Sequence, residues 1–242
     1  MLMHWLRRKD IEHAFSDGGV FMKVLFCNIA WMSFYKGLIP GVDEPVNGGS
    51  YVKKMGDAHE KYNFTPIQMD EFIDGTPAGE YCLGFVETKT SKSGKINDLH
   101  IEKIEGCAAA KNEDFIDDVL VIYCAAKPYQ NFTSVVGWYK HARVFRKYEC
   151  AEFDLVDGGT EQQFFNALAK KEDCVLLPTA ARRITEWNVP RRKTGAAYGF
   201  GQANVWFAED SDNNQLLEIY LNRLIDKIES YDGENWVDYF PQ

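Results

Sequence analysis

Short apolar runs of strand length dominate the first three quarters of the chain. Residues 23–30 (KVLFCNIA) and 118–126 (DVLVIYCAA) are almost continuously apolar, which is typical of strands buried on both faces. Residues 97–105 alternate between polar and apolar positions and predict a half-exposed strand. Further strands are expected at residues 80–88, 133–148, 151–156 and 173–177, where 133–148 fits either one long strand or a hairpin.

Helical patterns appear only toward the C-terminus. Residues 160–171 begin with Thr160 at an N-cap position, and the apolar residues at 164, 165 and 168 share one helical face. Residues 212–231 repeat apolar positions with a period of about 3.6 residues, and Gly233 provides a stop signal. These patterns predict an α+β fold, in which a curved mixed β-sheet or a small β-barrel carries two to three packed helices.

One domain accounts for most of the chain. With 242 residues, 45% of them hydrophobic, the sequence can bury one substantial core. We assign residues 22–231 to this domain, residues 1–21 to an N-terminal extension and residues 232–242 to a C-terminal tail. Residues 1–21 lack the apolar stretch of a secretory signal, and no apolar run is long enough to span a membrane. We therefore expect a cytoplasmic protein without a membrane partner.

The six cysteines support the same location. They form no C-x-x-C pair, and five of them lie in or beside apolar runs. Buried free thiols in a reducing compartment explain this pattern. The spacing of cysteines and histidines does not match a zinc site, so neither a metal nor a cofactor is expected.

Charge is distributed unevenly along the chain. The formal net charge is −9, but residues 209–242 hold nine acids and two bases, a net of −7, which leaves −2 for the other 208 residues. Residues 140–148 carry four bases and no acid, and residues 182–193 carry five bases and one acid. A local basic face can bind phosphates although the whole protein is acidic.

The first basic segment also contains aromatic residues. In an extended chain, Tyr139, Arg143 and Phe145 lie on one face, and Trp138 and Lys140 on the other. Such a mixture of rings and cations suits flat ligands that carry phosphates. The alternative is an ordinary strand with one face in the core and its bases in water.

A second aromatic and basic segment spans residues 187–206. Gly199 and Gly201 flank Phe200, and glycine lets the backbone approach a ligand closely. Gln202 and Asn204 offer paired donors and acceptors that suit a base edge. The alternative is a glycine-rich turn beside a core tryptophan, with the bases solvated.

Several separated motifs point to one kind of module. They are VLFCNIAWM at 24–32 with YKG at 35–37, NGGSYV at 47–52, YNF at 62–64, DDVLVIYCA at 117–125, VVGWYKHARVFR at 135–146, and VPR at 189–191 with GFGQANVWFA at 199–208. Together they resemble the N-terminal region of bacterial HNH-endonuclease-like, restriction-type proteins. The HNH nuclease part has no counterpart, because the chain lacks a His-Asn-His pattern and a Cys quartet. The resemblance implies a module that recognises nucleic acid, including DNA with modified bases, by fold-level analogy with PUA-like and EVE-like barrels.

The first hypothesis is therefore a nucleic-acid or nucleotide recognition module of restriction or defence type, without a catalytic residue. Aromatic rings would stack on bases, arginines would contact phosphates, and two amides would read polar edges. The expected ligand-binding residues are Trp31, Trp138, Tyr139, Arg143, Arg146, Trp187, Arg191, Arg192, Gln202, Asn204 and Trp206.

Two alternatives belong to other functional classes. Asp74, Glu87 and Lys89 match the loose pattern of a PD-(D/E)xK nuclease, in which carboxylates hold a metal ion. A module that binds a small ligand or a protein without nucleic acid is the other alternative. In that case the acidic C-terminal helix would be the docking surface for a protein partner.

Overall fold

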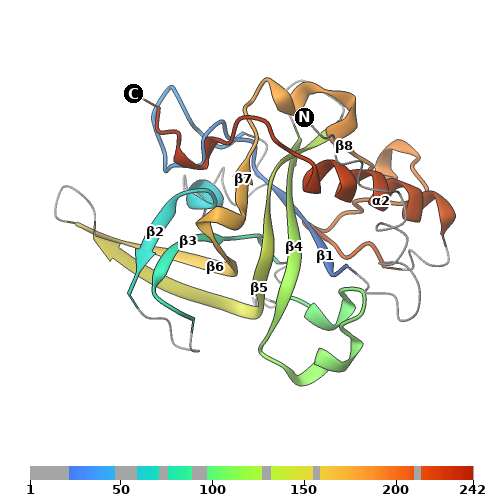
Figure 1. Ribbon diagram of the computed structural model, residues 1–242, viewed down its shortest axis with the longest axis horizontal. Coiled ribbons are helices and arrows are strands. Elements are labelled where there is room, and N and C mark those ends of the chain that lie inside the picture. Colours follow the sequence, from blue (N-terminus) through green and yellow to red (C-terminus); the bar gives the residue numbers. More distant parts are fainter. Residues whose placement is uncertain are drawn as a thin grey trace, which may run out of the picture.

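A nine-stranded mixed sheet organises the protein (Figure 1). The computed structural model describes residues 22–46, 59–70, 76–88, 97–126, 132–154, 159–209 and 214–241. The strands are β1 (Val24–Ile29), β2 (Pro66–Met69), β3 (Gly79–Gly84), β4 (Phe115–Ala126), β5 (Thr133–Asp154), β6 (Thr160–Lys170), β7 (Cys174–Leu176), β8 (Asn188–Val189) and β9 (Val205–Trp206).

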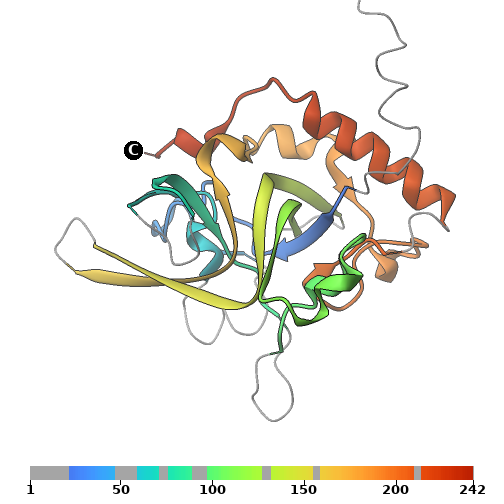
Figure 2. The ribbon, with the colours of Figure 1, turned by 60° about the horizontal axis from the view of Figure 1, so that its bottom comes forward.

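The sheet is curved but not closed. Its strand order is β2-β3-β6-β5-β4-β1-β9, with β7 and β8 paired separately with β5. Among the strands of the described residues, β1 and β4 are the only parallel pair, and the other pairs are antiparallel. Strand β5 is the central strand of the sheet, since it pairs with four other strands. It bends along its 22 residues (Figures 1 and 2).

The bend in β5 coincides with irregular pairing to β4. The register shifts at three places along this pair. Asp118 and His141 lie at one of the irregular stretches, and both adopt positive φ angles, 62° and 49°. Their side chains meet across the two strands, with 2.8 Å between His141 Nδ1 and Asp118 Oδ1. Bulges of this kind increase local twist, which explains how one long strand can serve both halves of the sheet.

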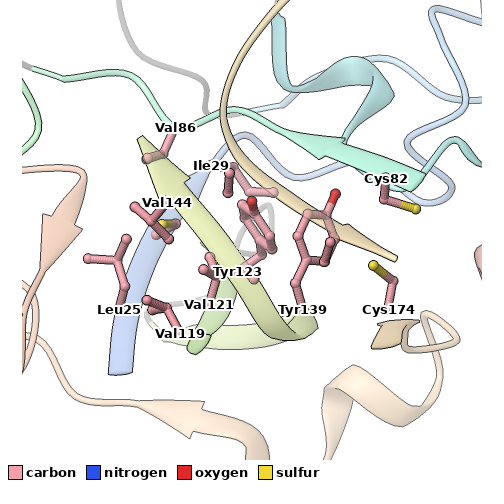
Figure 3. Packing of buried hydrophobic residues seen from close by; sticks show 14 of the residues in the cluster. Leu25, Ile29, Cys82, Val86, Val119, Val121, Tyr123, Tyr139, Val144 and Cys174 are labelled. Atoms are coloured by element: carbon pink, nitrogen blue, oxygen red, sulfur yellow. The ribbon is translucent and has the colours of Figure 1, made fainter. Parts of the chain in front are cut away.

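Two apolar clusters cover the two faces of the central strands. Because side chains alternate along a strand, Leu25 and Cys27 of β1 enter the inner cluster, whereas Phe26 enters the outer one. The inner cluster also contains Tyr123 and Tyr139 (Figure 3). The outer cluster lies between the sheet and helix α2 (Gln215–Glu229), which runs along one side of the molecule (Figure 2).

Helix α2 has a regular beginning and a single apolar face. The side chain of Asn214 caps it by accepting a hydrogen bond from the Leu217 amide. Leu217, Leu221, Leu224 and Ile228 are buried against the sheet. This spacing is the 3.6-residue periodicity expected from the sequence, so the helix is confirmed.

Most predicted strands are confirmed, but two predictions of local structure are wrong. Residues 160–171 form strand β6 instead of a helix, because they hydrogen-bond to β3 on one side and β5 on the other. Residues 97–105 contain a 3-10 turn at Ile101–Lys103 instead of a strand. The described residues thus form a mixed α+β fold with one α-helix, not two or three, and the sheet is open rather than a closed barrel.

The last residues pack on the domain. Val237 is buried in the inner cluster, and Trp236 stacks on Phe34 with 5.1 Å between ring centroids. In the part of the chain that the structure describes, no helix is both long and apolar enough to cross a membrane.

Candidate ligand-binding groove

The aromatic residues expected to stack on a ligand lie in the protein core. Trp138, Tyr139 and Trp187 are at most 1% exposed, and Trp31 and Trp206 are 8% exposed. The Trp138 and Trp187 rings stack on each other at 5.5 Å, and Trp206 stacks on Phe26 at 4.4 Å. The expected stacking surface is therefore not formed by these residues, because other protein side chains already cover their rings.

Arg143 and Arg146, the arginines of the first basic segment, hold the protein together. The Arg143 guanidinium binds both carboxylate oxygens of Asp117, at 2.7 and 3.2 Å, and lies 4.0 Å from the centroid of the Phe115 ring. Arg146 pairs with Glu102 at 2.7 Å and donates to two main-chain carbonyls. Arg143 is thus held within the fold, whereas Arg146, although tied to Glu102, also lines a hollow together with Lys147.

The second basic segment is divided between buried and exposed side chains. Arg182 is completely buried. Arg191 is half-buried, donates to the Thr133 hydroxyl and the Asn28 side chain, and lies over the Phe200 ring. Arg192 is exposed and remains available to a ligand.

The structure does join the 187–206 motif into one unit. The side-chain oxygen of Asn28 in β1 accepts a hydrogen bond from Arg191. The main-chain amide of Asn28 donates to the main-chain carbonyl of Asn204 at 2.6 Å. Pairing of β9 with β1 then fixes the residues that flank Asn204. Gln202 is exposed at the preceding turn, but it does not line the groove beside Asn204.

This groove brings together three segments that are distant in the sequence. Residues 87–88 follow β3, residues 97–103 precede β4, and residues 203–207 include β9. The groove has a volume of about 280 Å³. A second hollow of about 250 Å³ shares Thr88, Asn97 and Asp98 with it and continues toward Lys147.

Asn204 and Glu87 provide the polar chemistry of the groove. Asn204 Nδ2 donates to the Glu87 main-chain carbonyl and to Glu87 Oε2, both at 3.4 Å. Among the described residues, no hydrogen bond uses Asn204 Oδ1. Partial burial raises the pKa of the Glu87 carboxyl, and the hydrogen bond from Asn204 opposes this shift. Long hydrogen bonds of this kind can be exchanged for bonds to a ligand.

An aromatic ring and a cation complete the groove. Phe207 is half-buried and lines it, and Lys103 Nζ lies 6.0 Å from the centroid of the Phe207 ring. Thr88 anchors the opposite wall, because its amide donates to the Tyr148 hydroxyl at 2.7 Å and its hydroxyl donates to the Asn97 carbonyl at 2.7 Å. A flat polar ring could thus lie against Phe207 with its edge toward Asn204 and Glu87.

Of the groove residues, the sequence indicated Asn204 as a ligand-binding residue, but not Phe207 or Lys103. Phe207 directly follows the tryptophan of the 199–208 motif, and that position was the only signal for it. The nuclease hypothesis rests on Asp74, Glu87 and Lys89. Glu87 lies in the groove, whereas Asp74 and Lys89 lie outside the described residues. In the described part of the chain, no three His, Cys, Asp or Glu side chains are arranged to hold a metal ion.

Comparison of the chain with models of known protein families, with curated proteins and with solved structures gives no match.

Proposed function

We propose that the groove between residues 87–88, 97–103 and 203–207 binds a nucleobase of a nucleic acid or nucleotide. The juxtaposition of the Asn204 amide, the Glu87 carboxyl and the Phe207 ring carries this proposal. An amide presents a donor and an acceptor side by side, which matches the edge of a base. A carboxylate accepts from an exocyclic amino group, and a phenyl ring supplies a stacking surface.

Exposed cations near the groove suit the phosphates of such a ligand. Lys103 lines the groove, and Arg146 and Lys147 line the adjoining hollow. Arg192 is exposed in the motif that carries Asn204, but it does not line the groove. The same ligand class is implied by the resemblance to N-terminal modules of restriction-type proteins, which includes DNA with modified bases. In this proposal the buried tryptophans belong to the core and do not touch the ligand.

Binding to labelled oligonucleotides tests the proposal. Single-stranded DNA, plain duplexes and duplexes with modified bases are titrated with the protein by fluorescence anisotropy at several salt concentrations. Affinity should fall as salt rises, since phosphate contacts release counterions. Asn204→Ala should weaken binding by about tenfold or more, because one good base-edge contact contributes about 1–3 kcal/mol.

Gln202→Ala is the matched control, because Gln202 is exposed two residues away and does not line the groove. It should leave the affinity unchanged. Equal affinities of the wild type and Asn204→Ala would contradict the proposal. Lack of binding to every oligonucleotide at low salt would instead favour a small ligand or a protein as the partner.

A further inference from the structure

Two thiols meet inside the protein, away from the groove. Cys82 of β3 and Cys174 of β7 are fully buried and pack in the same inner cluster. The Cys174 thiol donates a hydrogen bond to the Lys170 carbonyl at 3.2 Å. Figure 3 shows the two sulfur atoms turned toward each other. They come from strands that do not pair with each other, and the ion pair between Lys171, just before β7, and Glu80 of β3 joins the two strands.

The closed protein keeps both thiols unreactive toward oxidants. Burial, followed by the contact with Cys82, raises the pKa of the Cys174 thiol well above its usual range. The thiolate is the nucleophilic form, and a raised pKa depletes it. Full burial also excludes an oxidant from solution.

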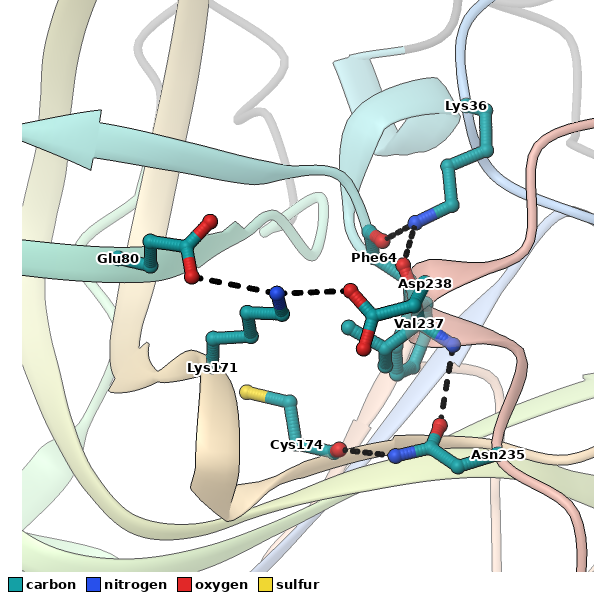
Figure 4. Close-up of polar contacts among 8 residues, drawn as sticks. All are labelled: Lys36, Phe64, Glu80, Lys171, Cys174, Asn235, Val237 and Asp238. Atoms are coloured by element: carbon teal, nitrogen blue, oxygen red, sulfur yellow. Dashed lines mark hydrogen bonds and ion pairs between the residues drawn. The ribbon is translucent and has the colours of Figure 1, made fainter.

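The C-terminal segment 235–240 covers this part of the molecule (Figure 4). Asn235 Nδ2 donates to the Cys174 carbonyl at 2.9 Å, and Asn235 Oδ1 accepts from the amides of Leu176 and Val237, both at 3.0 Å. Val237 is 1% exposed and packs in the same cluster as both cysteines. Asp238 pairs with Lys171 at 2.7 Å.

A lysine beside the thiols depends on the same segment. Lys36 Nζ donates to the carbonyls of Phe64 and Val237, and it lies 4.9 Å from the centroid of the Phe240 ring. Burial lowers the pKa of Lys36 to about 8, and Cys82 and Cys174 oppose this shift. When segment 235–240 lifts, Lys36 loses the Val237 carbonyl and gains water. A hydrated ammonium group favours the thiolate form of a neighbouring cysteine.

We infer that Cys82 and Cys174 are an oxidative modification site that forms a disulfide when segment 235–240 opens. Most side chains of this segment are exposed, and segments with few buried side chains open locally more easily than core strands do. The oxidant would be a hydroperoxide. One thiolate attacks it, an S–O bond forms as the O–O bond breaks, and a sulfenic acid and water (or an alcohol) result. The second thiol then displaces the sulfenic oxygen, which leaves as water, and the S–S bond forms.

Peptide mapping after peroxide treatment tests this inference independently of nucleic-acid binding. The full chain is treated with hydrogen peroxide, blocked with an alkylating agent and digested without reduction. We expect a Cys82–Cys174 cross-linked peptide that a reductant abolishes. Val237→Ser should form it about tenfold faster, since this change removes most of the burial energy that holds the segment closed. Asp232→Asn, an exposed change just before the segment, is the control and should leave the rate unchanged.

Two results would overturn the inference. One is oxidation of the exposed Cys150 alone, with Cys82 and Cys174 still alkylated as free thiols in both the wild type and Val237→Ser. The other is cross-linking at the same rate in the two proteins, because the segment would then not control access. If circular dichroism shows that Val237→Ser is unfolded, Asn235→Ala replaces it, because that change keeps the Val237 side chain and removes the side-chain hydrogen bonds that tie the segment to β7, together with the bond to the Val237 amide.

Discussion

The guanidinium of Arg182 is fully buried and joins three parts of the chain. It donates to the main-chain carbonyls of Met32, Ser33 and Leu177 at 2.7 to 2.8 Å. Burial lowers the pKa of Arg182 to about 10, and nearby Tyr35 and Asp43 oppose this shift, so the side chain is charged at neutral pH. Its position explains why a residue counted in a basic surface segment contributes nothing to that surface.

Replacing Arg182 with methionine should strongly destabilise the protein. Methionine has a similar length but no donors, so three buried carbonyls lose their partner, and each loss costs about 1–3 kcal/mol. Asp43, itself 1% exposed, also loses a compensating charge. Some of these groups will find water after local relaxation. We therefore expect a loss of about 3–5 kcal/mol, the range observed when one partner of a buried charge pair is removed.

Urea unfolding followed by circular dichroism measures this loss. Arg183→Met is the matched control, because Arg183 is the next residue and is exposed. A surface change of this kind should alter the free energy of unfolding by no more than about 0.5 kcal/mol. A loss below about 1 kcal/mol for Arg182→Met would refute the reasoning, because the three carbonyls would then not depend on the guanidinium.

Three further predictions concern pH and packing. Burial alone would raise the pKa of Glu102, but hydrogen bonds, first among them the one from Arg146, lower it to about 2. Stability should therefore fall as the pH drops from about 4.5 toward 2. Glu102→Gln should flatten this decline in acid unfolding curves. Burial lowers the pKa of Lys36 to about 8, so between pH 8 and 10.5 this lysine is protonated in the unfolded chain but not in the folded protein. The free energy of unfolding should therefore rise with pH in this range. Lys36→Met should remove that rise, and an unchanged dependence of stability on pH would contradict the lowered pKa of Lys36. Gly84→Ala should lower the urea midpoint markedly, because a Cβ at this position would lie 1.8 Å from the Tyr123 hydroxyl oxygen; a midpoint equal to that of the wild type would show that the ring moves freely.

The strands of the fold were largely predictable from the sequence. The runs at 23–30 and 118–126 became β1 and β4, which are buried on both faces as their continuous apolar pattern indicated. Strand β6 was not predictable from the same reasoning. Its apolar residues at 164, 165 and 168 fit a helical face, and only the hydrogen bonds to β3 and β5 decide the structure. Nonlocal pairing of this kind overrides local periodicity.

The candidate site was only partly predictable. Asn204 was identified from its amide and its place after a glycine turn, and the structure places it in a groove. The prediction that the tryptophans stack on a ligand was wrong, because their burial depends on residues far away in the chain. Trp138 is covered by Trp187 and Tyr231, which lie about 50 and 90 residues further on. Phe207 could not be predicted as a groove residue, because nothing in the neighbouring sequence distinguishes a phenylalanine that lines a groove from one in the core.

Mapping of amide chemical shifts shows directly whether the groove binds a nucleobase. The ¹⁵N-labelled protein is titrated with nucleoside monophosphates and with the tightest-binding oligonucleotide. If the groove binds the base, the largest shifts belong to residues 87–88, 97–103 and 203–207, and Asn204→Ala abolishes them while Gln202→Ala does not. Shifts confined to other surfaces, or identical shifts in Asn204→Ala and the wild type, would contradict the assignment of the groove.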